Sequence, residues 1–407
     1  MQYSSFVLPN GLRIVHLPSD STVSYCGYAV HAGTRDEQDG QFGLAHFVEH
    51  TIFKGTEKRK VHHILNRMEK VGGELNAYTT KEETFLYSVC LHEDIERAIE
   101  LLSDLIFNSI FPETEIEKEK EVVIDEIHAC EDSPSELIFD EFENLLFAGN
   151  DLGHAILGDE RSIKSFSTAS CIDFKNKFYR QENMVFFFYG KTPAAKIFRY
   201  VEKYSPNNFS AVSNHLSRSN PEFSSVETIT RSKNLHQTHV LTGGKAYGLF
   251  DDKRMNLLLL NNILGGPGMN SRLNVSLREK HGLVYSVEAD IVSYTNTGAF
   301  SIYFGCDSES MEQCLNLVHK ELKRLRDTKL SGSQLFAAVK QWKGQLGIAN
   351  EHKENVALRL GKYFLHFNKY DSLPQTYKKI ETLTAESLLE TANEIFSEDK
   401  LFSLIYQ

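Results

Sequence analysis

The stretch "GLAHFVEHTIFKGT", residues 43–56, decides how this chain is interpreted. Apolar residues recur in it at helical spacing, which predicts a helix. Positions i and i+4 share one helix face, so His46 and His50 can present two imidazoles to one metal ion. Glu49 lies beside them but is displaced around the helix, which suits a carboxylate that contacts an activated water rather than the metal. The alternative is an ordinary amphipathic helix that carries polar groups.

A hydrolytic zinc site usually has three protein ligands and a water whose pKa the metal lowers towards neutrality. Two histidines therefore leave a third ligand to be found, and it should be His, Glu or Asp. Because the chain has 16 histidines, H-x-x-E-H can arise by chance, and the motif alone does not decide between the two interpretations.

Composition limits the possible functions. The 407 residues have room for two or three domains, and 41% hydrophobic with 24% charged residues is typical of a soluble globular protein. The apolar runs are too short to cross a bilayer, so we expect no membrane partner. The net charge of −11 argues against general nucleic-acid binding, which needs a basic surface. An acidic surface favours solubility or attracts basic peptides.

The six cysteines are far apart and form no CxxC pair. This pattern favours buried free thiols in a reducing compartment over a disulfide framework. The first residues, "MQYSSFVLPNGLRIVHLP", resemble neither a signal peptide nor a transit peptide. We therefore expect a cytoplasmic protein, although a leader that has already been removed remains an alternative.

Hydrophobic periodicity predicts alternating strands and helices in the first half. "FVLPNGLRIVHLP" (6–18) predicts a hairpin with a Pro-Asn-Gly turn, and "TVSYCGYAVHAG" (22–33) predicts a half-buried strand. Residues 74–91 are interpreted as one strand. Helices are predicted at 62–73, 94–108 and 112–133.

A linker and an internal repeat organise the whole chain. Ser and Asn dominate between about residues 205 and 236, which predicts domains at 1–207 and 233–407 with a linker at 208–232. Residues 298–346 repeat the plan of residues 84–127: a strand ending near a cysteine, an acidic turn, a helix, a short break and another helix. In this superposition the two histidines fall on Leu257 and Asn261, so any metal site belongs to the first half alone.

Four further segments carry recognisable patterns. They are "GGELNAYTTKEETFLYS" (72–88), "EKEKEVVIDEIH" (117–128), "LGHAILGDERSIKSF" (152–166) and "NSRLNVSLREKHGLVYSV" (270–287). With the H-x-x-E-H inverzincin motif, they resemble the pitrilysin family of metallopeptidases, which includes insulin-degrading enzyme and the mitochondrial processing peptidases. The resemblance spans nearly the whole chain. It implies an α+β fold of two homologous domains, each an antiparallel-rich sheet packed with helices.

The resemblance also implies a ligand set. The family has a ligand glutamate on a helix downstream of its motif, and Glu126 stands at that spacing, near Gln345 of the second half in the superposition. We therefore expect one zinc ion per chain, bound by His46, His50 and Glu126. Glu119 stands where the family has a second acidic residue that supports the site. Without the resemblance, this glutamate-rich helix would be interpreted as a solvated charged face.

Other segments imply residues that contact substrate. Asn76 and Ala77 lie in the segment that resembles the family's edge strand, which pairs with the substrate backbone. Arg278 and Tyr285 match an arginine and a tyrosine that would donate hydrogen bonds to the developing oxyanion and the substrate carbonyls. Alternatively, Arg278 bonds a helix end and Tyr285 packs beneath it.

The length of the chain bears on its partners. Long family members carry four such domains, whereas this chain resembles the short class in which two chains close into a clamshell. We therefore expect a homodimer with shared active sites, and a heterodimer with a paralogous subunit remains an alternative. Glu136 and Asp140 are spaced like acidic residues that recognise arginine near the cut in processing peptidases, although solvated surface charge fits them equally well.

The implied activity is a zinc-dependent endopeptidase that cleaves peptides or unfolded segments in an enclosed chamber. Glu49 would act as the general base towards the zinc-activated water. One alternative is a non-catalytic, substrate-binding scaffold subunit, but the intact histidines, Glu49 and Glu126 argue against it. Another is a metallohydrolase of unrelated fold, but the internal repeat and the segment containing Arg278 argue against that.

Overall fold

The chain forms two compact units in a computed structural model that describes all residues except 1, 207–217, 219–220 and 222–226. The first unit comprises Met1–Ala129, Ala155–Leu216 and Ala349–Ser372; the second comprises Cys130–His154, Ser217–Ile348 and Leu373–Gln407. Each unit thus contains one segment from the other half of the chain. The expected bounds 1–207 and 233–407 mark the two halves but not these units. Most of the expected linker 208–232 lies outside the described residues, and Ile229–Arg231 within it form a strand.

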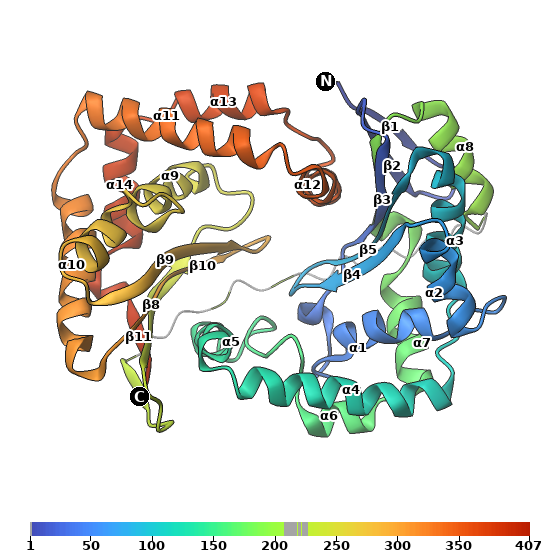
Figure 1. The fold of residues 1–407 in the computed structure, drawn as a ribbon, viewed down its shortest axis with the longest axis horizontal. Coiled ribbons are helices and arrows are strands. Elements are labelled where there is room, and N and C mark those ends of the chain that lie inside the picture. The colour runs from blue at the N-terminus through green and yellow to red at the C-terminus, as the bar shows by residue number, and fades with distance from the viewer. Residues whose placement is uncertain (1, 207–217, 219–220, 222–226) are drawn as a thin grey trace. The chain divides into compact units, whose positions relative to one another are not determined.

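The first unit is built on a six-stranded sheet (Figure 1). Its strands are β1 (Ser4–Val7), β2 (Arg13–Pro18), β3 (Val23–Val30), β4 (Glu74–Thr79), β5 (Thr84–Leu91) and β6 (Met184–Gly190). Their order is β1-β2-β6-β3-β5-β4, and every pair is antiparallel except β2 with β6. The predicted hairpin at 6–18 is therefore confirmed.

The expectation of one strand over residues 74–91 is wrong. A turn at residues 80–83 separates β4 from β5, and the two strands pair with Thr79 opposite Thr84. The hydroxyl oxygen of Thr80 accepts hydrogen bonds from the backbone N–H groups of Glu82 and Glu83. This is a Ser/Thr-type turn, which closes the hairpin without a glycine or proline.

Helices cover both faces of this sheet. The first unit's helices are α1 (Leu44–Thr51), α2 (Val61–Glu69), α3 (Ile95–Asn108), α4 (Glu113–Glu131), α6 (Glu160–Ser165), α7 (Thr168–Phe178), α8 (Ala194–Tyr204) and α12 (Lys353–Phe367). In β6, Phe186 and Phe188 pack in the core shared with α1 to α4, α7 and α8, whereas Val185 and Phe187 pack against α12. The wholly apolar run in β6 follows from burial on both faces.

Helix α12 comes from the second half of the chain but covers the first unit's sheet (Figure 1). Its residues Leu360 and Phe364 are buried against this face. A Cβ atom at Gly361 would lie 2.7 Å from a ring carbon of Phe187, which is fully buried. Glycine at this position therefore permits the close approach of helix and sheet.

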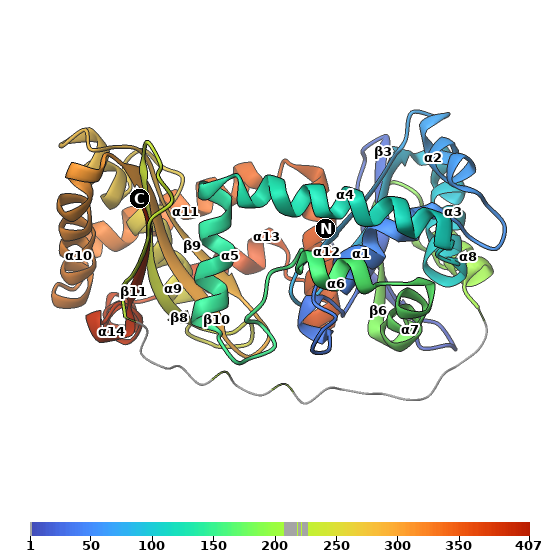
Figure 2. The ribbon, with the colours of Figure 1, turned by 90° about the horizontal axis from the view of Figure 1, so that it is seen from below.

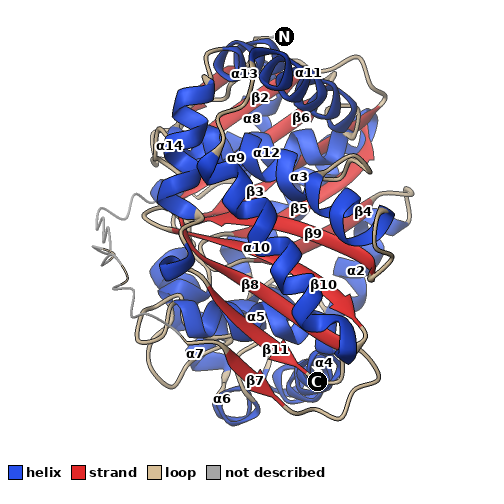
Figure 3. Ribbon diagram, turned by 90° about the vertical axis from the view of Figure 1, so that its left-hand side faces the viewer, coloured by secondary structure: helices blue, strands red, loops and turns tan. Residues whose placement is uncertain are grey.

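The second unit repeats this plan around a five-stranded sheet (Figure 3). Its strands are β7 (Ile229–Arg231), β8 (Thr238–Ala246), β9 (Val284–Ser293), β10 (Gly298–Cys306) and β11 (Phe402–Tyr406), in the order β7-β11-β8-β10-β9. Its helices are α5 (Pro134–Leu146), α9 (Arg254–Gly265), α10 (Met311–Asp327), α11 (Gly332–Ala349), α13 (Leu373–Glu381) and α14 (Ala385–Ile395), with a π-helical turn at Asn274–Glu279.

Helix α5, from the first half of the chain, packs beside β8 on one face of this sheet, and α9, α10 and α14 pack on the other (Figure 2). Phe142 of α5 stacks on Phe402 of β11 with ring centroids 4.4 Å apart. The repeated order of a strand followed by two helices, β5-α3-α4 and β10-α10-α11, confirms the predicted α+β fold of two related domains.

Two smaller expectations concern the cysteines and the membrane. All six cysteines are free thiols, and five of them are buried. Among the described helices, none has both the length and the apolar character needed to cross a bilayer.

Candidate metal centre

Helix α1 presents the two histidines, and its own packing fixes their direction. It begins after Gly43, whose φ of 93° favours glycine. The carboxylate of Glu37 accepts hydrogen bonds from the backbone N–H groups of Gly43 and Ala45, which satisfies donors at the helix start. Phe47 and Val48 are fully buried in the first unit's core. The adjacent face therefore carries His46 and His50.

Helix α4 brings Glu126 to these histidines. Oε2 of Glu126 lies 3.8 Å from Nε2 of His46 and 3.4 Å from Nε2 of His50. One ligand atom from each residue lies within 4.8 Å of the others. Zinc bonds of about 2.0–2.1 Å place tetrahedral ligand atoms about 3.3 Å apart. Two imidazoles and a carboxylate at these separations fit a catalytic zinc ion.

The protonation of the metal-free cluster differs between the two histidines. Burial, with a smaller contribution from His50, lowers the pKa of His46 to about 4. Burial opposes the charge on His50, but hydrogen bonds with Glu119 and Glu126 raise its pKa to about 9. The hydrogen bond from His50 lowers the pKa of Glu126. At neutral pH the cluster therefore contains a neutral His46, a charged His50 and an ionised Glu126.

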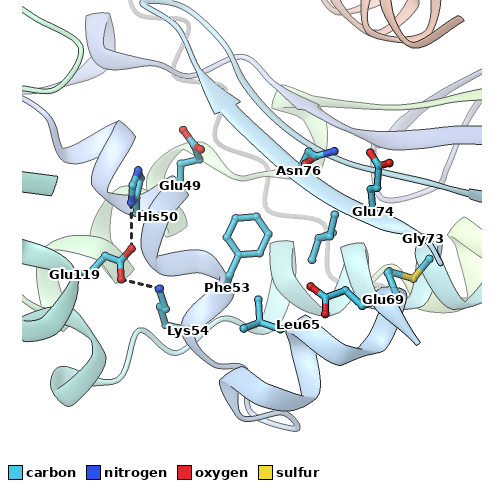
Figure 4. Close-up of a pocket in the computed structure, with 12 residues that line it drawn as sticks. Glu49, His50, Phe53, Lys54, Leu65, Glu69, Gly73, Glu74, Asn76 and Glu119 are labelled. Atoms are coloured by element: carbon cyan, nitrogen blue, oxygen red, sulfur yellow. Dashed lines mark hydrogen bonds and ion pairs between the residues drawn. The ribbon is translucent and has the colours of Figure 1, made fainter. Parts of the chain in front are cut away.

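Glu119 orients the His50 ring through its Nδ1 atom, on the side away from Nε2. Its Oε1 lies 3.1 Å from Nδ1 of His50, and its Oε2 lies 2.7 Å from Nζ of Lys54 (Figure 4). Hydrogen bonds from both partners lower the pKa of Glu119, although burial opposes them. Donation from Nδ1 fixes the ring and leaves Nε2 available for a metal, the arrangement in which a carboxylate typically supports a ligand histidine.

Glu49 lies beside the three-residue cluster but is not part of it. Its Oε2 accepts a hydrogen bond of 2.8 Å from the hydroxyl of Thr79 in β4. Burial raises the pKa of Glu49, whereas the Thr79 hydrogen bond lowers it. A carboxylate with a raised pKa beside a group suited to a metal is able to accept a proton.

A cavity of about 510 Å³ opens next to Glu49 and His50 (Figure 4). Phe53, Leu65 and Leu75 provide apolar lining, and Lys54 is neutralised by Glu119. The cavity is large enough for one side chain of a bound peptide.

The strand beside this cavity is an edge strand. Strand β4 pairs only with β5 within the described sheet, so one side of its backbone has no strand partner. Asn76 lines the cavity, and Ala77 packs against the core of the first unit. This is the geometry that an added peptide strand requires.

The remaining predicted residues belong to the second unit, whereas the metal cluster belongs to the first. The guanidinium of Arg278 lies 5.6 Å from the ring centroid of Tyr285, and Tyr285 is 83% exposed. The alternative in which Tyr285 packs beneath a helix end is therefore wrong. Glu136 and Asp140 lie on α5, where Glu136 is exposed and Asp140 half-buried.

In the second unit, the positions that match His46 and His50 carry no metal ligand. Leu257 is fully buried in α9, and Nδ2 of Asn261 donates to the carbonyl of Ala289. Within the part of the chain that the structure describes, the only group suited to a metal is the one in the first unit.

Sequence reasoning missed Thr79 and Lys54. Both were detectable in principle, because Lys54 follows His50 by one helical turn and Thr79 shares a strand face with Leu75 and Ala77.

Comparisons with protein-family models and with curated proteins identify relatives of this chain. Residues 14–160 match the model of the insulinase family, peptidase family M16, and residues 165–341 match the model of the peptidase M16 inactive domain. An uncharacterized zinc protease, YmxG, of Bacillus subtilis (strain 168) is 32% identical over 402 residues, covering 98% of this chain and 97% of the relative. An uncharacterized zinc protease of Rickettsia bellii (strain RML369-C) is 31% identical over 404 residues, covering 98% and 96%.

Solved structures share the fold. A protease from Helicobacter pylori superposes with a TM-score of 0.90 at 20% identity, covering 100% of this chain and 99% of that chain. A Pseudomonas fluorescens structure described as a peptidase M16 inactive domain gives a TM-score of 0.91 at 19% identity, covering 100% and 98%. With its two domain matches and its full-length relatives, the chain belongs to peptidase family M16, the insulinase or pitrilysin family.

Proposed function

We propose that this chain is a zinc-dependent endopeptidase that cleaves peptides or unfolded segments. One observation carries the proposal: Glu126 lies at zinc-compatible distances from the Nε2 atoms of His46 and His50, with a half-buried Glu49 beside them. The relatives named as zinc proteases support it.

The chain's residues divide the work of peptide hydrolysis. His46, His50 and Glu126 would hold the ion, and Glu119 would keep His50 oriented. When bound, zinc supplies a Lewis acid that polarises the scissile carbonyl and activates the attacking water. Glu49 would take a proton from the attacking water and would then pass it to the leaving amine.

Strand β4 would hold the peptide. A substrate segment pairing with the backbone of residues 75–79 gains main-chain hydrogen bonds with little demand on sequence. The cavity lined by Phe53 and Leu65 then accepts a side chain next to the cut. Because Glu49 also lines this cavity, a peptide seated there brings its scissile bond to the base.

A second copy of the chain would complete the site. We propose a homodimer that encloses a chamber, in which the exposed Tyr285 and Arg278 of one copy donate hydrogen bonds to a substrate bound at the other copy's metal centre. An equimolar mixture of Glu49→Gln and Tyr285→Phe proteins tests this. Mixed dimers should regain cleavage, whereas verified subunit exchange without recovery would exclude shared sites.

The proposed chemistry is tested by metal analysis together with cleavage of a peptide mixture. We expect one zinc per chain, endoproteolytic products, loss of cleavage on chelation and recovery when zinc is restored. Stoichiometric zinc without cleavage of any peptide would instead favour the alternative in which the chain acts only as a subunit of a heterodimer. Cleavage that survives complete removal of metal would refute the proposal.

A further inference from the structure

The last residue of strand β4, Thr79, forms a hydrogen bond with the candidate base. The hydroxyl of Thr79 donates to Oε2 of Glu49 at 2.8 Å. Within the described part of the chain, this is the only hydrogen bond that the Glu49 carboxylate accepts. Glu49 is half-buried, so the orientation of its carboxylate depends on this contact and on packing. With Oε2 held by Thr79, Oε1 is the oxygen left to accept a proton from water.

We propose that Thr79 is a positioning residue that sets the orientation of the Glu49 carboxylate for proton transfer. The inference rests on the proposed peptidase function and assigns a role that the metal-binding residues do not supply. The alternative is structural: the hydroxyl only satisfies a half-buried polar group at the end of a strand.

The turn that follows Thr79 is anchored to a neighbouring segment of the first unit. The backbone N–H of Thr34 donates to the carbonyl of Thr80 at 3.2 Å, and that of Arg35 donates to the carbonyl of Lys81 at 2.8 Å. The Arg35 guanidinium lies 2.7 Å from Glu82, and both side chains are buried. Breaking such a buried pair is costly, so the turn is held in one conformation.

Helix α12 fixes the same turn from another side. Oε1 of Glu83 lies 2.6 Å from Nε2 of His366 and 3.0 Å from Nζ of Lys362. The side chains of Glu83 and His366 are only 4% and 1% exposed. Thr80 donates to the other carboxylate oxygen of Glu83 at 2.9 Å. The segment around Thr34 and Arg35 and helix α12 thus both hold the turn. We call this anchored turn, residues 80–83, the frame; Thr79 precedes it and contacts Glu49.

This frame links substrate alignment to proton transfer. In the proposed function, the peptide pairs with the backbone of β4, and the last residue of β4 holds the base. Strand β4 then sets both the position of the scissile bond and the position of the Glu49 carboxylate. A base displaced by even about 1 Å can lower a rate by about 100-fold, so a fixed reference has catalytic value.

The test compares Thr79→Val, Thr79→Ser and a matched control, Thr84→Val. Thr84 lies opposite Thr79 in β5, and its hydroxyl donates to the carbonyl of Ala32 at 2.9 Å, away from Glu49. We expect Thr79→Val to lower kcat by about 10- to 100-fold, with KM within about twofold and zinc content unchanged. Thr79→Ser should recover most of kcat. Thr84→Val should keep wild-type kcat even if it lowers Tm.

A second readout does not depend on turnover. Crystal structures of zinc-loaded Thr79→Val and Thr79→Ser should show the Glu49 carboxylate rotated away in the first and retained in the second. If Thr79→Val does not fold, Thr79→Ala replaces it in both measurements. Wild-type kcat in Thr79→Val, an equal loss of kcat in Thr84→Val, or no rescue by serine would each overturn the inference. Failure of the proposed function is distinguishable, because wild-type protein would then cleave no peptide.

Discussion

Zinc binding to this chain should release a proton, because His50 is charged in the metal-free protein. The pKa of His50 is raised to about 9 by its hydrogen bonds with Glu119 and Glu126, against the effect of burial. Its Nδ1–H faces Glu119, and its Nε2–H faces Glu126. A metal at Nε2 must displace the second proton and leave the first in place.

The size of the effect follows from the pKa values. At pH 7, a pKa of about 9 leaves about 1% of His50 deprotonated, which weakens zinc binding about 100-fold, or about 2.7 kcal/mol. His46, with a pKa of about 4, is already neutral and releases nothing. The zinc affinity should therefore rise about tenfold per pH unit between about pH 5 and 8.

Isothermal titration calorimetry at pH 6, in two buffers with different ionisation enthalpies, measures this proton directly. That pH lies well below the value near 7 at which water activated by zinc ionises. We expect about one proton released per zinc. A variant with His62→Ala and His63→Ala removes an exposed pair of imidazoles, with ring centroids 3.9 Å apart, that could bind zinc adventitiously. Zinc binding at pH 6 without proton release, or an affinity that is flat from pH 6 to 8, would refute the reasoning.

Three further predictions concern the support of the site and the frame around it. Glu119→Gln should weaken zinc binding about 10- to 100-fold in a chelator competition, because the side chain that contacts Nδ1 of His50 loses its charge. The control is Glu117→Gln, which should bind zinc normally. The carboxylate of Glu117 pairs with Lys120 on the same helix and not with His50. Burial opposes the charge of Glu83, but His366 and Lys362 lower its pKa to about 2. Ionised Glu83 therefore stabilises the folded protein fully above the unfolded-state pKa near 4.5. This stabilisation is lost as the pH falls towards 2. The gap in unfolding free energy between wild type and Glu83→Gln should therefore narrow by up to about 3 kcal/mol from pH 5 to pH 2 in urea titrations, and a constant gap would count against this network. In thermal melts, Gly361→Ala should destabilise the protein by about 1–3 kcal/mol, because the added Cβ would lie 2.7 Å from the Phe187 ring. The control is Gly344→Ala, whose added Cβ has nothing within 4 Å. This variant should be neutral or slightly stabilising.

The sequence predicted the histidine helix well because its information is local. The i, i+4 spacing of His46 and His50 and the apolar residues between them determine both the helix and the face. Glu126 could not be found in this way. Helix α4 carries many glutamates, and which one meets the histidines depends on how α4 packs against α1. Only the resemblance to a family indicated it.

Two features of the fold were not predictable from periodicity. The turn at residues 80–83 contains no glycine, proline or asparagine, so the alternating pattern of β4 continued into β5 without a visible break. The strand face of Thr79 follows from the sequence, but its bond with Glu49 depends on how β4 packs against α1. The apolar face of α12 predicts a buried helix but not its partner, because either sheet offers an apolar surface. Helix α12 packs against the sheet of the first unit, and only long-range tertiary contacts decide this.

The central claim is that Glu49 transfers the proton in a zinc-dependent cleavage. The most direct test measures zinc content and peptide turnover together in wild type and Glu49→Gln, which keeps the shape of the side chain. We predict one zinc per chain in both proteins and a turnover at least about 100-fold lower in the variant. Near-normal turnover by zinc-loaded Glu49→Gln would contradict the account.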